Sequence, residues 1–152
     1  MFFRTRKKES PHQSLKSFVL FQNLNSKELA RLSSLLHYRS YLKGEIVFDE
    51  GEEGQGLFLV ASGAVSISGK GSFFASHSVS IKRGEFFGEI ALLENVPRSA
   101  QARATEDTEL ISLFRADFFN LLETDGKIAA KISLQLARYL SKRLKETIQG
   151  KE

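Results

Sequence analysis

The sequence has no cysteine and no tryptophan, and only two prolines and one methionine among its 152 residues. Without cysteine the chain forms no disulfide and offers no thiolate to a metal ion or an iron–sulfur cluster. It also lacks any apolar run close to the roughly 20 residues that a membrane-spanning helix needs. The first eight residues, MFFRTRKK, lack the apolar middle of a secretion signal. We therefore expect a cytoplasmic protein with no membrane span.

The composition is that of a folded globular protein. Hydrophobic residues make up 41% of the chain and charged residues 26%, which is a balance that excludes intrinsic disorder. Phenylalanine occurs 13 times, so we expect a core rich in phenylalanine. The net charge of +4 favours an anionic ligand, but it is too small to indicate nucleic-acid binding by itself.

Residues 1 to about 12 are basic and polar and include Pro11. We interpret them as a flexible, solvated tail. The alternative is a basic arm that binds a membrane surface or a partner. The tail is the preferred interpretation, because a few scattered positive charges bind anionic lipid only weakly. The remainder, residues 13–152, has the length of one domain.

Hydrophobic spacing divides this domain into helical and extended parts. A short helical piece over 14–21 precedes a helix that is capped at Asn25 or Ser26, has Glu28 in its first turn and ends near His37. From Tyr38 the period becomes two and glycine turns are frequent, which predicts a β-sandwich or jelly roll over about 38–114. The fold class is therefore α+β, mainly β. The expected strands are 38–42, 45–49, 57–61, 64–68, 76–82, 99–104 and 109–114.

Two further helices are expected over about 115–149. The first spans Ala116 to Glu123, with Phe118, Leu121 and Leu122 facing inward. The second is long, from about Lys127 to Gln149, and its apolar stripe exceeds what covering one sandwich requires. That stripe predicts either pairing with a second copy of the chain or closure as a lid over a ligand. Its residues are Ile128, Ile132, Leu136, Leu140, Leu144 and Ile148.

The chemistry concentrates in residues 86–100, FFGEIALLENVPRSA. Gly88 allows close approach of the backbone to a ligand, and a single helical turn from Glu89 to Leu93 would direct free N–H groups toward an anion. Arg98 offers a planar fork of donors that suits two phosphate oxygens. Glu89 is an acceptor suited to a sugar hydroxyl. The stretch therefore predicts one pocket for a phosphate and a sugar.

This stretch resembles the phosphate-binding cassette of the cyclic nucleotide-binding domain family. The family pattern is Phe-Gly-Glu-(aliphatic)-Ala-Leu, a short variable piece, and then Pro-Arg-(small)-Ala. Every fixed position is filled here, and the resemblance extends over nearly the whole chain from about Phe18. The matching residues are Phe87, Gly88, Glu89, Ile90, Ala91, Leu92, Pro97, Arg98, Ser99 and Ala100.

The resemblance implies a role for each part of the cassette. Arg98 would bind the exocyclic phosphate oxygens, while Gly88 and Glu89 would hold the ribose 2′-hydroxyl. Ser99 would favour cAMP over cGMP, because family members that accept guanine often carry Thr at this position. The other expected contacts are Phe87 and the backbone N–H groups of Ile90, Ala91 and Ser99.

The base needs a cover, and the family supplies it from the long helix. The position that faces the base in several relatives falls at Tyr139, where many relatives carry Arg instead. A tyrosine ring there would stack on the purine. The alternative is an aromatic residue that serves only to pack the helix. Gln135 and Arg143, one turn away on either side, are the next candidates.

Enzymatic and metal chemistry find no support in the sequence. His12, His37 and His77 share no spacing typical of metal ligands, and no arrangement of Ser, His and acid or of paired carboxylates suggests catalysis. Gly56 is followed by Leu57 and not by the Lys of a nucleotide-triphosphate loop. We expect a non-enzymatic protein without metal.

The function that these residues favour is a stand-alone regulatory protein that senses cAMP, or cGMP, and relays it to an unknown effector through its C-terminal helices. We expect no direct DNA binding, because no winged helix-turn-helix follows the long helix before Glu152. Met1 and the absence of a membrane span or kinase motif argue against a piece of a channel or kinase. The alternative is the same fold regulating a partner with another small ligand or with none.

Overall fold

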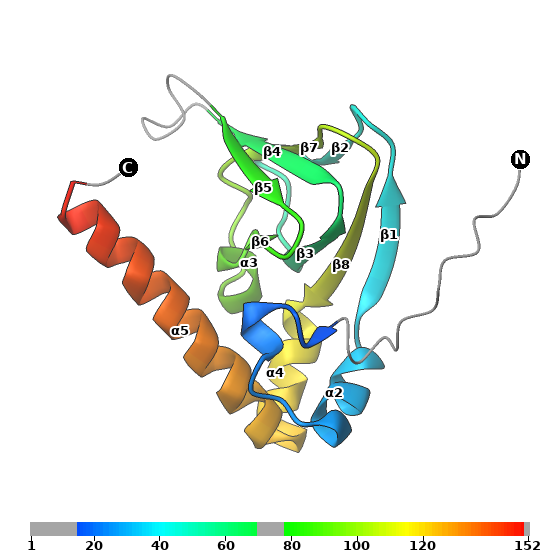
Figure 1. The fold of residues 1–152 in the computed structure, drawn as a ribbon, viewed down its shortest axis with the longest axis vertical. Helices are drawn as coiled ribbons and strands as arrows, with labels where there is room; N and C mark the ends of the chain where they lie inside the picture. The colour runs from blue at the N-terminus through cyan, green and yellow to red at the C-terminus, as the bar shows by residue number, and fades with distance from the viewer. Residues whose placement is uncertain (1–14, 70–77, 151–152) are drawn as a thin grey trace, which may run out of the picture.

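A computed structural model describes residues 15–69 and 78–150, and its centre is a sandwich of two four-stranded sheets (Figure 1). All strand pairs within each sheet are antiparallel. The predicted sandwich, mainly β with helices at both ends of the chain, is confirmed. The first sheet has the order β1 (His37–Tyr41), β8 (Thr108–Phe114), β3 (Gly56–Ser62) and β6 (Phe86–Phe87), and the second has the order β2 (Ile46–Phe48), β7 (Gln101–Ala104), β4 (Ala64–Ser68) and β5 (Val79–Lys82).

In the first sheet β3, β6 and β8 have buried residues on both faces, whereas β1 is exposed at four of its five residues. Side chains alternate between the faces of a strand, so on β3 Leu57 and Leu59 belong to one hydrophobic cluster while Val60 belongs to another. Residues of β6 divide in the same way, because Phe86 joins the first cluster and Phe87 the second. The first cluster lies between this sheet and the helices, and the second fills the space between the sheets.

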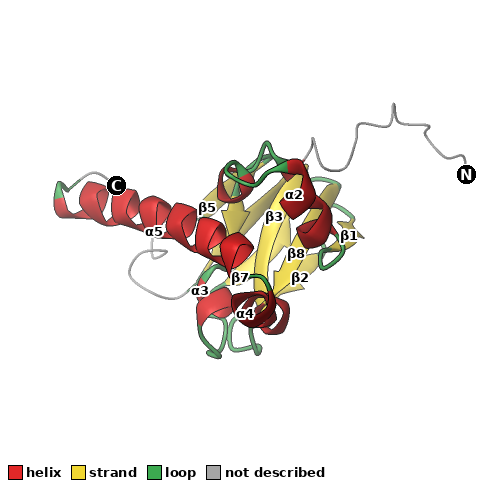
Figure 2. Ribbon diagram, turned by 90° about the horizontal axis from the view of Figure 1, so that it is seen from below, coloured by secondary structure: helices red, strands yellow, loops and turns green. Residues whose placement is uncertain are grey.

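Helices cover the outer face of the first sheet and meet at one end of the sandwich (Figure 2). Asn25 caps α2 through a complete capping box, in which its side chain accepts from the Glu28 backbone and Glu28 accepts in return. The predicted cap at Asn25 is thus confirmed. The helical elements of this layer are η1 (Val19–Phe21), α2 (Ser26–Ser33), α4 (Arg115–Thr124) and α5 (Gly126–Ile148).

The long helix α5 has a buried half and an exposed half. Ile128, Ile132 and Leu136 are at most 2% exposed and pack in the helical cluster. Farther along the same stripe, Leu144 is 60% exposed and Ile148 75%, and this end of the helix extends away from the sandwich (Figure 1). Within residues 15–69 and 78–150, only the first half of the predicted stripe is therefore covered.

Several local predictions need correction. The strand β6 was not expected, because two phenylalanines carry no visible alternation. Leu122 was predicted to face inward but is 47% exposed, since α4 buries only Phe118 and Leu121. The helix α2 ends at Ser33, and His37 begins β1 instead of ending a helix. The tail predicted over residues 1 to 12, with His12, lies outside the described residues, as does His77.

Candidate functional site

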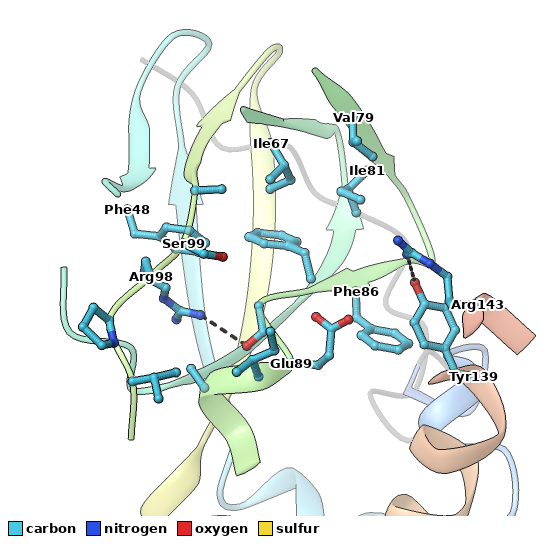
Figure 3. Close-up of a pocket in the computed structure, with 17 residues that line it drawn as sticks. Phe48, Ile67, Val79, Ile81, Phe86, Glu89, Arg98, Ser99, Tyr139 and Arg143 are labelled. Atoms are coloured by element: carbon cyan, nitrogen blue, oxygen red, sulfur yellow. Dashed lines mark hydrogen bonds between the residues drawn. The ribbon is translucent and has the colours of Figure 1, made fainter. Parts of the chain in front are cut away.

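A pocket of about 380 Å³ opens between the cassette, the second sheet and α5, a volume within the range of roughly 300–1,000 Å³ that small-ligand sites occupy. Figure 3 shows Arg98 and Ser99 on one side of it, Glu89 between, and Tyr139 with Arg143 on the opposite side. The pocket therefore brings together predicted residues that lie about 40 positions apart in the sequence. All eight predicted site residues line it: Phe87, Gly88, Glu89, Ile90, Ala91, Arg98, Ser99 and Tyr139.

Arg98 is held by backbone carbonyls and an aromatic face. Its Nη2 donates to the carbonyl of Gly56 at 2.8 Å, and its Nη1 donates to the carbonyl of Gly88 at 3.2 Å. The guanidinium carbon lies 4.1 Å from the centre of the Phe48 ring, a cation–π geometry.

The Arg98 side chain is a buried cation with unused hydrogen-bonding capacity. It is 9% exposed, and its Nε has no hydrogen-bond partner among the described residues. Burial lowers the pKa of its guanidinium, an effect that Glu52 and Glu89 oppose and Arg115 reinforces. A buried charge is costly unless it is paired. An anion that reached Arg98 from the pocket would therefore offset the cost of burying its positive charge.

Gly88 is required for this arrangement. Its φ of +76° lies in the left-handed region, which side chains disfavour. A Cβ added there would come within 2.6 Å of Arg98 Nη1, so any side chain would displace the guanidinium. The sequence prediction that Gly88 allows close approach is consistent with this geometry, although the group that approaches here is Arg98.

Glu89 and the helical turn α3 (Ile90–Leu93) form the floor of the cassette. Glu89 is half-buried at the start of α3 and its side chain does not cap the helix. The N–H of Ala91, predicted to contact phosphate, donates to the Gly88 carbonyl at 3.2 Å. A phosphate contact from this amide would therefore require the turn to shift.

Tyr139 and Arg143 form a pair on the α5 side. The Tyr139 ring lies 4.5 Å from the Phe86 ring, between centres, and its hydroxyl accepts from Arg143 Nη1 at 2.8 Å. Tyr139 thus packs the helix against Phe86 and also lines the pocket, while its stacking on a base stays a prediction. Gln135 is different: it is 8% exposed and donates to the Val19 carbonyl, and it does not line the pocket.

Sequence reasoning missed the apolar side of the pocket. Ile67 of β4 and Val79 and Ile81 of β5 lie there together with Phe48 and Phe86. The alternation of β4 and β5 could indicate which residues share a face, but not that this face meets the cassette. Arg115 was missed as well, although it follows a predicted strand and carries a charge where a helix begins.

The histidines and acidic residues in the described parts of the chain do not form a metal site. His37 stacks on Phe114, with ring centres 4.6 Å apart. Over residues 15–69 and 78–150, His, Asp and Glu side chains form no group of three or more that could hold a metal ion. Within the same ranges, none of the helices combines the length and apolar character needed to cross a bilayer.

Residues 38–125 match the family model described as the cyclic nucleotide-binding domain. With more than half of the sequence matched and the cassette geometry in place, the chain belongs to the cyclic nucleotide-binding domain family, as its sequence pattern indicated.

The chain is similar to regulatory proteins of several kinds. It is 38% identical over 133 residues to the cyclic AMP receptor protein of Thermus thermophilus, an alignment covering 83% of this chain and 59% of that protein. It is 33% identical over 108 residues to a cAMP-dependent protein kinase regulatory subunit of Eremothecium gossypii, covering 71% of this chain and 23% of that protein. The chain thus spans less than two thirds of either relative.

A solved structure shares the fold. The crystal structure of the Thermus thermophilus catabolite activator protein superposes with a TM-score of 0.75 and 35% identity, covering 87% of this chain and 61% of that one. The names of these relatives are those of regulatory proteins.

Proposed function

We propose that this chain is a receptor for a cyclic nucleotide, with cAMP as the preferred ligand and cGMP as the second. The observation that carries the proposal is Arg98, a buried cation beside the pocket whose Nε lacks an acceptor within the described residues. A cyclic phosphate supplies the missing negative charge and acceptor oxygens together.

The pocket suits the rest of such a ligand. Glu89 provides a carboxylate for the ribose 2′-hydroxyl close to Arg98, on which its charge acts. Ile67, Val79 and Ile81 give the base an apolar wall, and Tyr139 lies where a ring can stack on it. The ligand is bound without chemical change in this proposal, and no metal takes part.

Two residues favour different bases. Ser99 supports adenine by the family resemblance. Arg143, held at the pocket by the Tyr139 hydroxyl, carries only donors and suits the two adjacent acceptors O6 and N7 of guanine. We give cAMP first place because the similar proteins named above include a cyclic AMP receptor protein and a cAMP-dependent kinase regulatory subunit.

Ligand binding would be relayed to a partner by movement of α4 and α5. Ligand that binds more tightly to a closed cassette shifts the population toward that state, and α4 and α5 would follow α3. The exposed end of α5, with Leu140, Leu144 and Ile148, is the surface we assign to an effector protein or a second copy of this chain. A cytoplasmic location belongs to the same proposal.

A second candidate is the same fold answering to another small ligand or to none. The feature in its favour is Tyr139, at a position where the family resemblance implies Arg in many members. Against it stand Arg98 and Glu89, both present and both at the pocket.

Isothermal titration with cAMP and then cGMP tests the proposal. We expect heat of binding at micromolar concentration or below for at least one of them, and the ratio of affinities measures base preference. Arg98→Ala serves as the control that should remove the heat. If the wild-type protein gives no heat of binding with either nucleotide, the proposal is refuted and the second candidate is favoured.

A further inference from the structure

Arg115 joins three separate parts of the chain. Its Nη1 donates to the carbonyls of Ala91 at 2.8 Å, Gly54 at 2.9 Å and Glu94 at 3.2 Å. Its backbone N–H donates to the Gln55 carbonyl at 2.7 Å. One residue therefore links the loop before β3, the end of the cassette turn α3 and the beginning of α4.

The stability of α4 does not explain why its first residue is an arginine. Arg115 is the first residue of α4, where the positive end of the helix dipole disfavours a cation. The carbonyls of Ala91 and Glu94, in contrast, lie at the C-terminal end of α3, where a cation is favoured and unpaired carbonyls need donors. The side chain thus stabilises α3 at the expense of its own helix.

The junction that Arg115 holds is tightly packed and adjoins Arg98. A Cβ added at Gly54 would lie 2.6 Å from the Cβ of Ala91 and 3.3 Å from Arg98 Nε. Gly54 therefore brings its carbonyl to Arg115 while its α-carbon lies against the cassette. Movement of α3 must break or carry along the hydrogen bonds that end on Arg115.

We infer that Arg115 is a positioning residue, which fixes the end of the cassette turn to the start of α4 and so couples the cassette to the C-terminal helices. Arg115 does not line the pocket, so it acts on a ligand through α3, through the loop at Gly54 and through its charge near Arg98. The effect on nucleotide binding rests on the proposed function, whereas the effect on the cassette itself does not.

Hydrogen exchange of the ligand-free protein tests the structural part. Arg115→Ala should accelerate amide exchange in residues 88–95 while leaving β4 and β7 unchanged. Arg115→Lys, which keeps the charge but loses the planar fork, should lie between it and the wild type. The matched control is Arg103→Ala, because the exposed Arg103 of β7 also donates through Nη1 to a backbone carbonyl, that of Gly44 at 2.7 Å, which is not part of the cassette.

The coupling between the cassette and the C-terminal helices is tested with site-specific labels, which introduced cysteines can carry because the chain has no cysteine of its own. Labels placed through Glu106→Cys and Lys145→Cys, two exposed positions on the sandwich and on α5, report the distance between them before and after cAMP is added. With Arg115→Ala we expect about tenfold weaker cAMP binding and a smaller distance change at saturating nucleotide. Arg103→Ala should match the wild type in both.

The outcomes separate the two proposals. Unchanged exchange in residues 88–95 of Arg115→Ala, or a full distance change at saturation, would overturn the role of Arg115. If the alanine variant does not fold, the same comparison is made with Arg115→Lys. A wild-type protein that ignores both nucleotides, with a cassette that still loosens in the variant, would refute the proposed receptor and support the positioning role.

Discussion

The two walls of the pocket are built in different ways. The cassette wall is a continuous stretch in which Arg98, Gly88 and α3 contact each other within 11 residues of sequence. The helix wall is supplied by Tyr139 and Arg143, about 40 residues later. The first wall is fixed to the sandwich by hydrogen bonds to β3, whereas the second depends on where α5 packs.

This difference indicates a division of labour. A buried, charged wall with backbone partners is suited to hold a phosphate in one geometry. A half-exposed helix wall, bound through the Phe86–Tyr139 contact, can change position at lower cost. We therefore expect affinity to depend chiefly on the cassette and base preference on the helix.

Arg98→Ala should have the largest effect. Removing the guanidinium is expected to cost about 2–4 kcal/mol of cyclic nucleotide binding, because a charged hydrogen-bonded pair is lost. Arg98→Lys should lose less, since it keeps the charge without the fork. Titration calorimetry measures both, and circular dichroism verifies that the variants remain folded. Unchanged affinity of the alanine variant would rule out Arg98 as the phosphate ligand.

Glu89→Ala should cost somewhat less, about 1.5–3 kcal/mol, the range for a hydrogen bond to a charged group. The test pairs the variant with 2′-deoxy-cAMP. The wild type should discriminate against the deoxy ligand, and the variant should bind both ligands equally. A variant that still prefers the 2′-hydroxyl would show that another residue contacts the ribose.

Tyr139→Ala should weaken binding by about 1 kcal/mol, the lower end for stacking of a base on an aromatic ring. Tyr139→Phe keeps the ring but removes the acceptor of Arg143, so it should alter the ratio of cAMP to cGMP affinity more than either affinity alone. Competition of the two nucleotides at equilibrium measures the ratio. If neither variant changes affinity or ratio, the helix wall does not contact the base.

The smallest effect concerns the anchor of α5. Lys131 Nζ lies 2.7 Å from Glu28 Oε1 and, as the largest contribution, lowers the pKa of that carboxyl. Because this pKa is lowered on folding, the ionised carboxylate of Glu28 stabilises the fold at pH values above its unfolded pKa of about 4.3. This stabilisation is lost as the pH falls through the folded pKa.

Lys131→Ala should therefore reduce stability near neutral pH by about 0.2–1 kcal/mol, as for partly exposed ion pairs. Urea titrations at pH 7 and pH 3 should show this deficit at pH 7 and a much smaller one at pH 3. An equal deficit at both values would assign the effect to side-chain packing instead of charge.

The sequence predicted best where neighbouring residues decide the structure. The helical turn after Glu89, the cap at Asn25 and the strand periods over 38–68 all depend on local spacing, and the structure has them. It predicted less well where burial is set by distant partners. Leu122 and Leu121 are equivalent by sequence, yet only Leu121 meets the core, because the cover over α4 comes from elsewhere in the chain.

The candidate site divides along the same line. The sequence by itself determined the fold family and the spacing of the acid, the base and the glycine of the cassette, because the cassette is one run of adjacent residues. The tertiary structure decided that Phe48 lies beneath Arg98, that Arg115 holds α3, and that Tyr139 and Arg143 reach the pocket while Gln135 does not. These contacts join residues 24 to about 50 positions apart, and only the packing of strands and helices brings such residues together.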